Sequence, residues 1–199
     1  MRERRDARRS SAGPAPQVAL AGNPNVGKSS LFNRLTGSRQ HVANWPGKTI
    51  ERRTGVCRCG EGDVELVDLP GTYSLAGLSP EEQAAAEALT DPGLAAVVVV
   101  VDATNLERNL YLAAQVAELG RPMVVALNMV DAADRDGFVI DDARLSRALG
   151  APVVRTVARS GDGLDELRRA LGEATDAASG AATCPPEPPS VESTQEGSR

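Results

Sequence analysis

The sequence predicts an α/β fold of the P-loop NTPase class, with helices on both faces of a mainly parallel sheet. Residues 22–30 fit the phosphate-loop pattern G-x-x-x-x-G-K-[ST], with an apolar strand before them and a helix after them. Further along, continuously apolar runs alternate with helical patterns, which is typical of parallel strands covered on both faces. We expect a G domain with six strands, one of them an antiparallel edge strand.

The elements can be placed along the chain. Residues 38–48 show no periodicity and are expected to form a mobile loop. The extended stretches 50–58 and 64–67 flank a Gly-rich turn, which predicts a hairpin. Ser79 and Glu82 form a capping box at the start of a helix. The other expected elements are strands at 17–21, 97–101, 123–127 and 152–157, and helices at 30–35, 104–119, 141–149 and 164–171.

Length and composition suit a single domain. The chain has 199 residues, of which 41% are hydrophobic, and a formal net charge of −5. We place the folded domain at residues 17–173. A basic arm, 1–16, and a Pro-rich tail, 174–199, lack the composition of a core and are expected to be disordered. The acidic balance argues against a nucleic-acid partner.

The sequence predicts a cytoplasmic location. The longest apolar run, 94–101, is far shorter than the ~20 residues that span a bilayer. The basic start has no apolar segment behind it and is not expected to be a secretory signal. Three cysteines do not suggest a disulfide framework. Two of them, Cys57 and Cys59, share one strand face, and we expect half-exposed thiols there rather than a metal site.

The phosphate loop predicts the residues that handle phosphate and magnesium. Backbone N–H groups of the loop bind phosphate oxygens at the positive end of the following helix. Lys28 reaches the β- and γ-phosphates, and the Ser29 hydroxyl binds Mg²⁺. Thr49 supplies a second hydroxyl to Mg²⁺, and Asp68 holds the ion through water. The N–H of Gly71 contacts the γ-phosphate and so senses hydrolysis.

Two later segments predict guanine recognition. Asp131 accepts hydrogen bonds from guanine N1–H and its amino group, whereas adenine offers no matching donors. Asn128 braces the loops around the base, Met129 covers it, and the N–H of Ala158 reaches guanine O6. The predicted nucleotide-binding residues are Gly22, Asn23, Pro24, Asn25, Val26, Gly27, Lys28, Ser29, Ser30, Asn128, Met129, Asp131, Val157, Ala158 and Arg159. Lys28, Asn25, Thr49 and Gly71 are the candidate catalytic residues.

The sequence also predicts the roles of three other residues, Thr72, His41 and Trp45. Thr72 follows Gly71 where many GTPases carry a water-orienting Gln, so we expect slow intrinsic hydrolysis. His41, the only histidine, lies in the expected mobile loop, and a general-base role is disfavoured because phosphoryl transfer depends on positioning and electrostatics. Trp45 is expected to anchor the loop over the site.

Five segments stand out together: 22–28 (GNPNVGK), 44–47 (NWPG), 68–75 (DLPGTYSL), 102–112 (DATNLERNLYL) and 128–131 (NMVD). They resemble the cytosolic G domain of the bacterial ferrous iron transport protein FeoB family, over about residues 17–172. The resemblance implies GTP hydrolysis, regulation of Fe²⁺ uptake and activation by K⁺. The implied K⁺ ligands are the side-chain carbonyl of Asn25 and the backbone carbonyls of Ala43 and Trp45, although Asn25 has the alternative of bonding only within its loop.

The resemblance also has departures. Ala43 and Lys48 stand where the family commonly has Gly and Val. Family members normally continue into a helical spacer and a membrane permease, and we expect neither in this chain. We therefore expect either a free-standing G domain acting in trans on a membrane iron permease, peripheral at the inner membrane, or the remnant of a split transporter. Two other functions stay open: an RNA-linked GTPase, and a nucleotide-binding interaction module with little hydrolysis.

Overall fold

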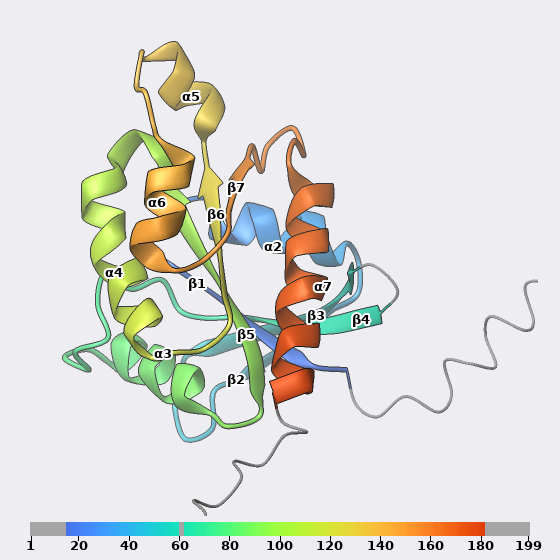
Figure 1. Ribbon diagram of the computed structural model, residues 1–199. Coiled ribbons are helices and arrows are strands. Elements are labelled where there is room, and N and C mark those ends of the chain that lie inside the picture. The colour runs from blue at the N-terminus through green and yellow to red at the C-terminus, as the bar shows by residue number, and fades with distance from the viewer. Residues whose placement is uncertain (1–14, 60–61, 182–199) are drawn as a thin grey trace, which may run out of the picture.

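The computed structural model describes residues 15–59 and 62–181. These residues form a central sheet with helices on both faces (Figure 1). Most of the predicted basic arm, 1–16, and of the predicted tail, 174–199, lies outside the described residues. The described helices include none that is long and apolar enough to pass through a lipid bilayer.

The sheet has seven strands in the order β2-β3-β4-β1-β5-β6-β7. β1, β4, β5, β6 and β7 are mutually parallel, whereas β3 runs antiparallel to both of its neighbours. The strands are β1 (Gln17–Gly22), β2 (Gln40–Asn44), β3 (Glu51–Cys59), β4 (Gly62–Asp68), β5 (Leu94–Asp102), β6 (Met123–Asn128) and β7 (Val153–Thr156). The predicted mixed sheet and its antiparallel edge region are confirmed.

The prediction of six strands is wrong because the stretch 38–48, expected to be a mobile loop, contains β2. Four of the five β2 residues are exposed, so the strand has no apolar face that periodicity could reveal. Its stability comes from backbone pairing with β3, in the register Gln40 opposite Gly55 to Asn44 opposite Glu51. The predicted β3–β4 hairpin is confirmed. β2 therefore forms the edge, outside the antiparallel strand β3.

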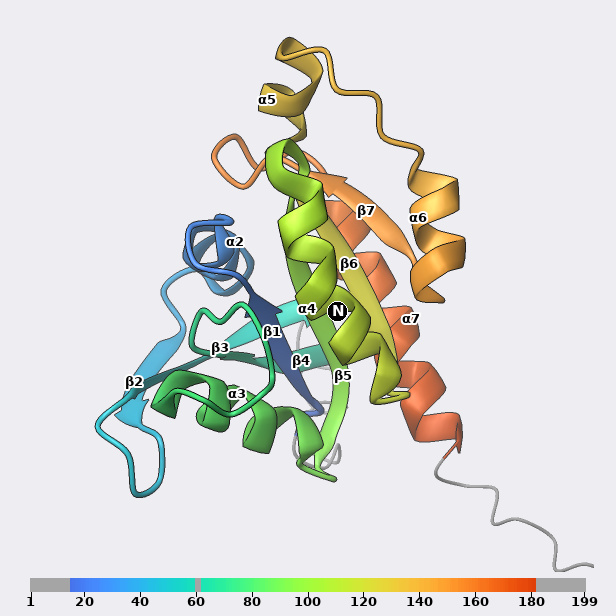
Figure 2. The same cartoon turned by 90° about the vertical axis from the view of Figure 1, so that its left-hand side faces the viewer.

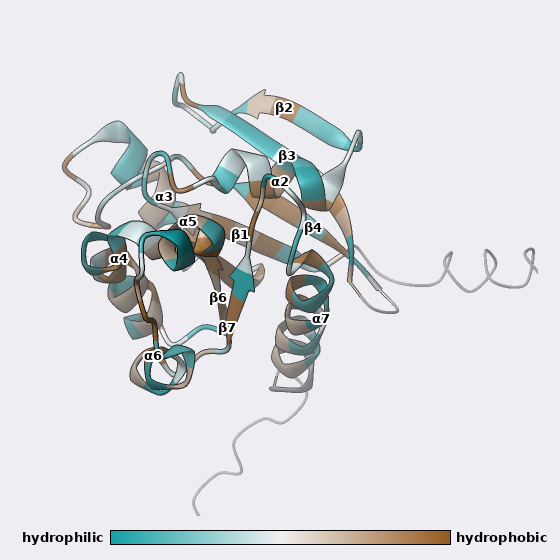
Figure 3. Cartoon of the chain, turned by 90° about the horizontal axis from the view of Figure 1, so that it is seen from above, coloured by the Kyte–Doolittle hydropathy of each residue, from teal (hydrophilic) through white to brown (hydrophobic). Residues whose placement is uncertain are grey.

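The helices cover the two faces of the sheet in separate groups. They are α2 (Lys28–Thr36), α3 (Pro80–Thr90), α4 (Leu106–Glu118), α5 (Val130–Arg135), α6 (Asp142–Leu149) and α7 (Leu164–Ala181), with a 3₁₀ turn at Ala103–Asn105. α2 and α7 pack on one face, and α3 and α4 on the other (Figure 2). Alternate valines of β5 enter the two cores, which accounts for the continuously apolar strand. In Figure 3 the hydrophobic colour is concentrated on the central strands, such as those labelled β4 and β6.

The capping box before α3 is confirmed, and it also holds the chain that follows β4. The Ser79 hydroxyl accepts a hydrogen bond from the Glu82 N–H at 3.1 Å. The Glu82 carboxylate accepts from the Leu78 N–H and from the Ser74 hydroxyl, both at 2.9 Å. The hydrogen bond from the Leu78 N–H, and to a smaller extent the one from the Ser74 hydroxyl, hold the pKa of Glu82 below its usual value. The segment between Gly71 and α3 is thus attached to the start of this helix.

The folded domain extends past its predicted end at residue 173, because α7 continues to Ala181. Ala174 packs against the core, and Thr175 is buried. The Thr175 hydroxyl donates to the Leu171 carbonyl at 3.1 Å, which satisfies this polar group inside the helix. The sequence after Leu171 is rich in Ala, Gly and Thr, so it lacks the large apolar residues that mark a helical stripe.

The two strand cysteines are buried, which contradicts the expected half-exposure. Cys57 and Cys59 are 0% and 3% exposed, and their sulfur atoms lie 3.7 Å apart. They belong to the core that α7 covers, and the sequence reasoning failed because it ended that helix too early. Within residues 15–59 and 62–181, no group of three or more His, Cys, Asp or Glu side chains is placed to hold a metal ion.

Candidate nucleotide-binding site

A pocket of about 610 Å³ lies at the carboxyl ends of the parallel strands β1, β4, β6 and β7. Ligands of open α/β sheets bind at this edge, and the volume is within the range of small-molecule sites. The lining residues are Asn23, Pro24, Asn25, Gly27, Lys28, Ser29, Ser30, Gly71, Asn128, Met129, Asp131, Val157, Ala158 and Arg159. Gly22, Val26, Thr49 and Asp68 are predicted site residues that do not line it.

The two glycines of the phosphate loop are required by close contacts. Gly27 has a φ of 87°, and a Cβ there would lie 2.2 Å from the Nδ2 atom of Asn128. At Gly22 a Cβ would lie 2.8 Å from the Val100 carbonyl oxygen. Only a residue without a side chain can bring the loop this close to β5 and β6. The phosphate loop therefore packs directly against the ends of β5 and β6.

Two other residues of the pocket have a left-handed backbone. The φ of Asn25 is 67° and the φ of Met129 is 63°. Asn adopts this conformation readily, whereas for Met it costs about 1–2 kcal/mol. Strained residues of this kind gather at functional sites, where the surrounding structure holds them. Met129 directly precedes α5, so its conformation turns the chain from β6 into the helix that carries Asp131.

Asn128 joins the three loops around the pocket, as predicted. The side chain is 2% exposed, and its Nδ2 donates to the Val26 carbonyl of the phosphate loop at 2.8 Å. Its Oδ1 accepts from the Ala158 N–H at 2.9 Å and from the Thr156 hydroxyl at 3.3 Å. One buried carboxamide thus connects the phosphate loop, the end of β6 and the loop after β7. Sequence reasoning missed Thr156, because a threonine at the end of a strand carries no motif.

The Ala158 N–H donates to the Asn128 Oδ1 in this structure, and its contact with guanine O6 stays a prediction. The predicted base-reading carboxylate, Asp131, lines the pocket with its side chain 47% exposed and lies 3.5 Å from the Arg135 guanidinium. Its outer position leaves the carboxylate accessible to a ligand.

Lys28 and Asp68 form a buried ion pair at the phosphate end of the site. The side chains are 10% and 9% exposed, so each neutralises a charge that would otherwise be costly to bury. The predicted phosphate-binding cation and the predicted Mg²⁺-binding carboxylate are therefore adjacent. Gly71 approaches the phosphate loop: a Cβ there would lie 3.3 Å from the Cα of Pro24.

The structure does not bring Thr49, Ala43 and Trp45 to this pocket. Ala43 pairs with Arg52 in the β2–β3 ladder, and Thr49 is exposed in the connection between these strands. The carbonyl of Trp45 accepts from the Lys48 N–H at 3.0 Å, and its N–H donates to the Ile50 carbonyl at 2.8 Å. We call this connection, residues 44–51, the hairpin segment.

Trp45 anchors the hairpin segment, but not over the nucleotide site as expected. Its side chain packs against the core beneath α3, on the other side of the sheet from α2. The Lys48 ammonium adds a contact with the Glu87 carboxylate of α3 at 2.8 Å. His41 is exposed on β2. The hairpin segment is thus attached to α3, away from the phosphate loop.

Sequence reasoning also missed the contacts that α4 makes with the phosphate loop and with the chain after Gly71. The guanidinium of Arg108, on α4, stacks on the Tyr73 ring with 4.1 Å between the guanidinium carbon and the ring centroid. The Arg108 carbonyl accepts from the Asn23 carboxamide at 3.4 Å. Arg108 and Tyr73 belong to the segments 102–112 and 68–75 that carry the family resemblance. Only their proximity in space shows that α4 connects the phosphate loop with the chain after Gly71.

The fold and the site together define a P-loop G domain. The family profile of ferrous iron transport protein B matches residues 16–171. A curated Fe(2+) transport protein A/Fe(2+) transporter FeoB fusion protein of Porphyromonas gingivalis is 50% identical over 154 residues, which is 76% of this chain and 18% of that protein. The Fe(2+) transporter FeoB of Escherichia coli K12 is 48% identical over 158 residues, covering 77% of this chain and 20% of that protein.

Solved structures agree. The G domain of the T. maritima FeoB iron transporter has a TM-score of 0.75 at 42% identity, over 81% of this chain and 99% of that one. A point mutant of S. thermophilus NFeoB bound to GDP has a TM-score of 0.74 at 46% identity, over 80% of this chain and 61% of that one. The chain belongs to the FeoB family. It spans about a fifth of the length of the curated relatives that it matches.

The connection through Asn128 leads to a stability prediction. Asn128→Ala leaves the Ala158 N–H and the Val26 carbonyl buried without partners, and each such loss costs ~1–3 kcal/mol. We expect the free energy of unfolding without nucleotide to fall by about 2–4 kcal/mol. Asp131→Ala, three residues further along on α5 and half exposed, should change it by less than ~0.5 kcal/mol. Guanidinium denaturation of both variants provides the measurement, and equal stabilities would contradict the structural role of Asn128.

Proposed function

We propose that this chain binds GTP and hydrolyses it to GDP and phosphate. The observation that carries the proposal is the position of Asp131 on the rim of a pocket that Asn128 holds together beside the phosphate loop. A carboxylate there accepts two hydrogen bonds from guanine and none from adenine. The S. thermophilus relative whose structure contains GDP supports the same assignment.

The phosphate end offers groups for both the nucleotide and Mg²⁺. Mg²⁺ binds hydroxyl and carboxylate oxygens, and Ser29 and Asp68 supply these two ligand types at the start of α2 and the end of β4. When bound, Mg²⁺ neutralises charge on the β- and γ-phosphates. Lys28 would bind the phosphates and Asp68 would hold Mg²⁺, so each side chain would exchange the other for a new partner. Thr49 joins this set only after the hairpin segment moves.

Thr72 stands where many GTPases carry a water-orienting Gln. Thr72 is buried, and its hydroxyl donates to the Ser74 carbonyl at 2.7 Å while accepting from the Ser74 N–H at 3.3 Å. This hydroxyl is therefore engaged within its own turn, which supports slow intrinsic hydrolysis. The remaining contribution of the chain is positional: Lys28 binds the phosphates, and the Gly71 N–H contacts the γ-phosphate.

We propose that K⁺ supplies the missing positive charge beside the phosphates. The Asn25 side-chain carbonyl is a neutral oxygen ligand in the phosphate loop, and Asn25 lines the pocket. The two backbone carbonyls implied by family resemblance, those of Ala43 and Trp45, lie at the end of β2 and in the hairpin segment. Neither residue lines the nucleotide pocket, so these carbonyls would complete a K⁺ site only if the hairpin segment moved toward Asn25. Hydrolysis is then coupled to a movement of this segment.

Family membership supports a role in ferrous iron uptake. The curated relatives are Fe²⁺ transporters, and this chain matches about a fifth of their length. We propose that GTP hydrolysis by this domain regulates Fe²⁺ passage through a membrane permease, with which the domain associates at the cytoplasmic face of the membrane. The hairpin segment and the chain after Gly71 change with the nucleotide, so they are the surfaces through which the nucleotide state is transmitted.

Guanine specificity is the first test. We expect GDP to bind at least ~100-fold more tightly than ADP, because adenine leaves Asp131 without donors. Asp131→Asn should weaken GDP binding and favour xanthine nucleotides, whose extra carbonyl accepts from the new amide. Asp134→Asn, on the same helix but outside the pocket, is the matched control and should behave like the wild type. Equal affinities for ADP and GDP in calorimetry would overturn the guanine assignment.

Potassium dependence is the second test. Hydrolysis in KCl should exceed hydrolysis in NaCl at equal ionic strength by roughly tenfold, or about 1.4 kcal/mol of barrier. Asn25→Gly removes the carbonyl ligand but permits the same positive φ, so it should erase most of this difference with little effect on GDP affinity. Single-turnover hydrolysis gives the rates, and calorimetry gives the affinity. Identical rates of the wild type in the two salts would reject the K⁺ mechanism and leave nucleotide binding standing.

The role in transport is tested in cells that depend on ferrous iron. Deleting the chain should lower Fe²⁺ uptake, and the wild type should restore it. Lys28→Ala, which loses the phosphate-binding cation, should fail to restore uptake, whereas Arg53→Gln on the exposed part of β3 should succeed. Uptake that stays unchanged on deletion would contradict the proposed link to transport.

A further inference from the structure

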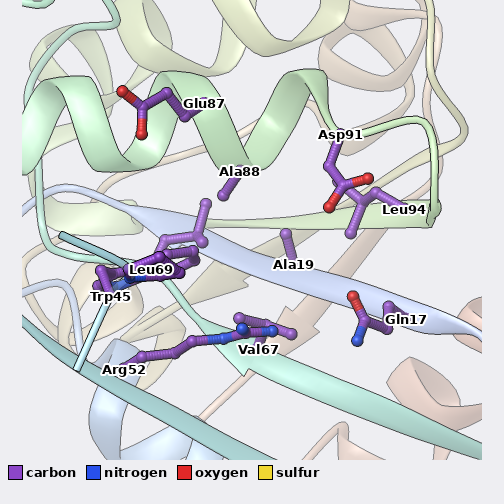
Figure 4. A pocket seen from close by; sticks show the side chains of 11 residues that line it. Gln17, Ala19, Trp45, Arg52, Val67, Leu69, Glu87, Ala88, Asp91 and Leu94 are labelled. Atoms are coloured by element: carbon purple, nitrogen blue, oxygen red, sulfur yellow. The ribbon is translucent and has the colours of Figure 1, made fainter. Parts of the chain in front are cut away.

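The domain has two smaller cavities, which lie beside two different loops. The first, of about 230 Å³, lies between β1, β4 and α3. Figure 4 shows Trp45 and Arg52 on the side opposite α3, with Glu87 and Asp91 on the α3 side. Because side chains of both charge signs line this cavity, it favours neither an anion nor a cation. Apolar packing of Trp45 holds the hairpin segment beside it.

The second cavity lies next to the nucleotide pocket, between α2 and the loop after β7. Its volume is about 330 Å³, and its lining residues are Ser30, Asn33, Arg34, Ala158 and Arg159. Ser30, Ala158 and Arg159 also line the nucleotide pocket. We call residues 157–162 the base loop, because Ala158 is expected to contact guanine. The loop between β7 and α7 lies directly above α2 in Figures 1 and 2. The cavity therefore separates the base loop from this helix.

The base loop is compact in itself. The Val157 N–H donates to the Asp162 carbonyl at 3.0 Å, and the Gly161 N–H donates to the Val157 carbonyl at 2.8 Å. These hydrogen bonds set the shape of the loop but not its distance from its neighbours. On the β6 side, the loop is held by the hydrogen bond from Ala158 to Asn128. On the α2 side, a cavity takes the place of close packing.

One side chain crosses from α2 to the base loop. The guanidinium of Arg34, in the last turn of α2, donates a hydrogen bond to the Arg159 carbonyl. Its Nη1 also lies beside Gly161, 3.5 Å from the position that a Cβ of that residue would take. The planar fork of a guanidinium suits such a contact at two positions. Arg34 thus supports the base loop from the side opposite to Asn128.

The backbone of Arg34 is fixed by α7. Its carbonyl accepts a hydrogen bond from Arg168 Nη2 at 3.4 Å, and Arg168 Nη1 is paired with the Asp165 carboxylate at 2.7 Å. The side chain of Arg34 therefore extends from a held position. Its hydrogen bond to Arg159 is strengthened by the charge, but the contact is exposed, so competition with water limits its contribution.

We infer that Arg34 is a positioning residue for the guanine nucleotide: it holds the base loop in place through the Arg159 carbonyl and so slows release of the nucleotide. Arg34 does not itself line the nucleotide pocket. Its contacts are at the base end, whereas Lys28 and Gly71 lie at the phosphate end. Removing Arg34 should therefore act on dissociation of the nucleotide and not on hydrolysis. This inference rests on the proposed function.

The kinetic test measures release of N-methylanthraniloyl-GDP into excess unlabelled GDP. Arg34→Gln keeps a good helix former but is too short to reach the loop, so it should raise the dissociation rate about fivefold. Arg34→Lys keeps the charge and one donor of similar reach, and should raise the rate only about twofold. Arg169→Gln is the matched control: this exposed arginine of α7 pairs only with Glu166 among the described contacts, and its loss should leave the rate unchanged.

Hydrolysis separates positioning from a general loss of structure. The single-turnover rate at saturating GTP should change by less than about twofold in Arg34→Gln, because the phosphate end is intact. An unchanged dissociation rate in Arg34→Gln would overturn the inference. A fall in hydrolysis as large as the rise in dissociation would also contradict it, because the variant would then have disturbed the whole site.

Amide hydrogen exchange without nucleotide tests the position of the base loop independently. Arg34→Gln should speed exchange of the Ala158 N–H at least ~threefold, because its hydrogen bond to Asn128 opens more often when the loop is held on one side only. Arg169→Gln should not. Unchanged exchange of Ala158 in Arg34→Gln would refute the support by Arg34. If the wild type binds no guanine nucleotide, the proposed function fails, whereas the exchange measurement still decides whether Arg34 positions the loop.

Discussion

The organisation of the nucleotide pocket depends on the hydrogen bonds of one buried side chain, Asn128. Its carboxamide donates to Val26 of the phosphate loop and accepts from Ala158 and Thr156 near the end of β7. The close approach is possible because Gly27 has no Cβ. A side chain with both a donor and an acceptor at its tip can connect two other loops, which no apolar residue and no carboxylate can do. The base end of the pocket is therefore held together by hydrogen bonds between the protein's own backbone and side-chain groups.

The phosphate end is organised differently. Lys28 and Asp68 satisfy each other, while the hairpin segment that carries Trp45 and Thr49 is attached to α3 through an aromatic contact and an ion pair. The ion pair is largely exposed on the side of Glu87 and is worth little. The attachment thus depends mainly on Trp45, in a cavity that is incompletely filled. The base end is thus held by buried hydrogen bonds, whereas the hairpin segment is held by few contacts.

Much of the fold and most of the pocket could be predicted from the sequence, because the relevant signals are local. Apolar strands, the phosphate loop and the Asn128–Asp131 segment each carry a pattern of residue types. β2 escaped prediction because its mostly exposed side chains show no alternation of apolar and polar residues. α7 was ended too early because Ala174 and Thr175 pack as small residues. The location of Trp45 and the bond between Asn128 and Ala158 depend on contacts between distant segments, which spacing along one chain does not reveal.

The central claim, a preassembled base end beside a detachable hairpin segment, is tested most directly by amide hydrogen exchange. The account predicts that the Ala158 N–H is strongly protected both without nucleotide and with a non-hydrolysable GTP analogue in Mg²⁺ and K⁺. The N–H groups of Trp45 and Lys48, which are bonded within the hairpin segment, should change their protection when the analogue binds. Rapid exchange of Ala158 without nucleotide, or unchanged protection of Trp45 and Lys48, would contradict it.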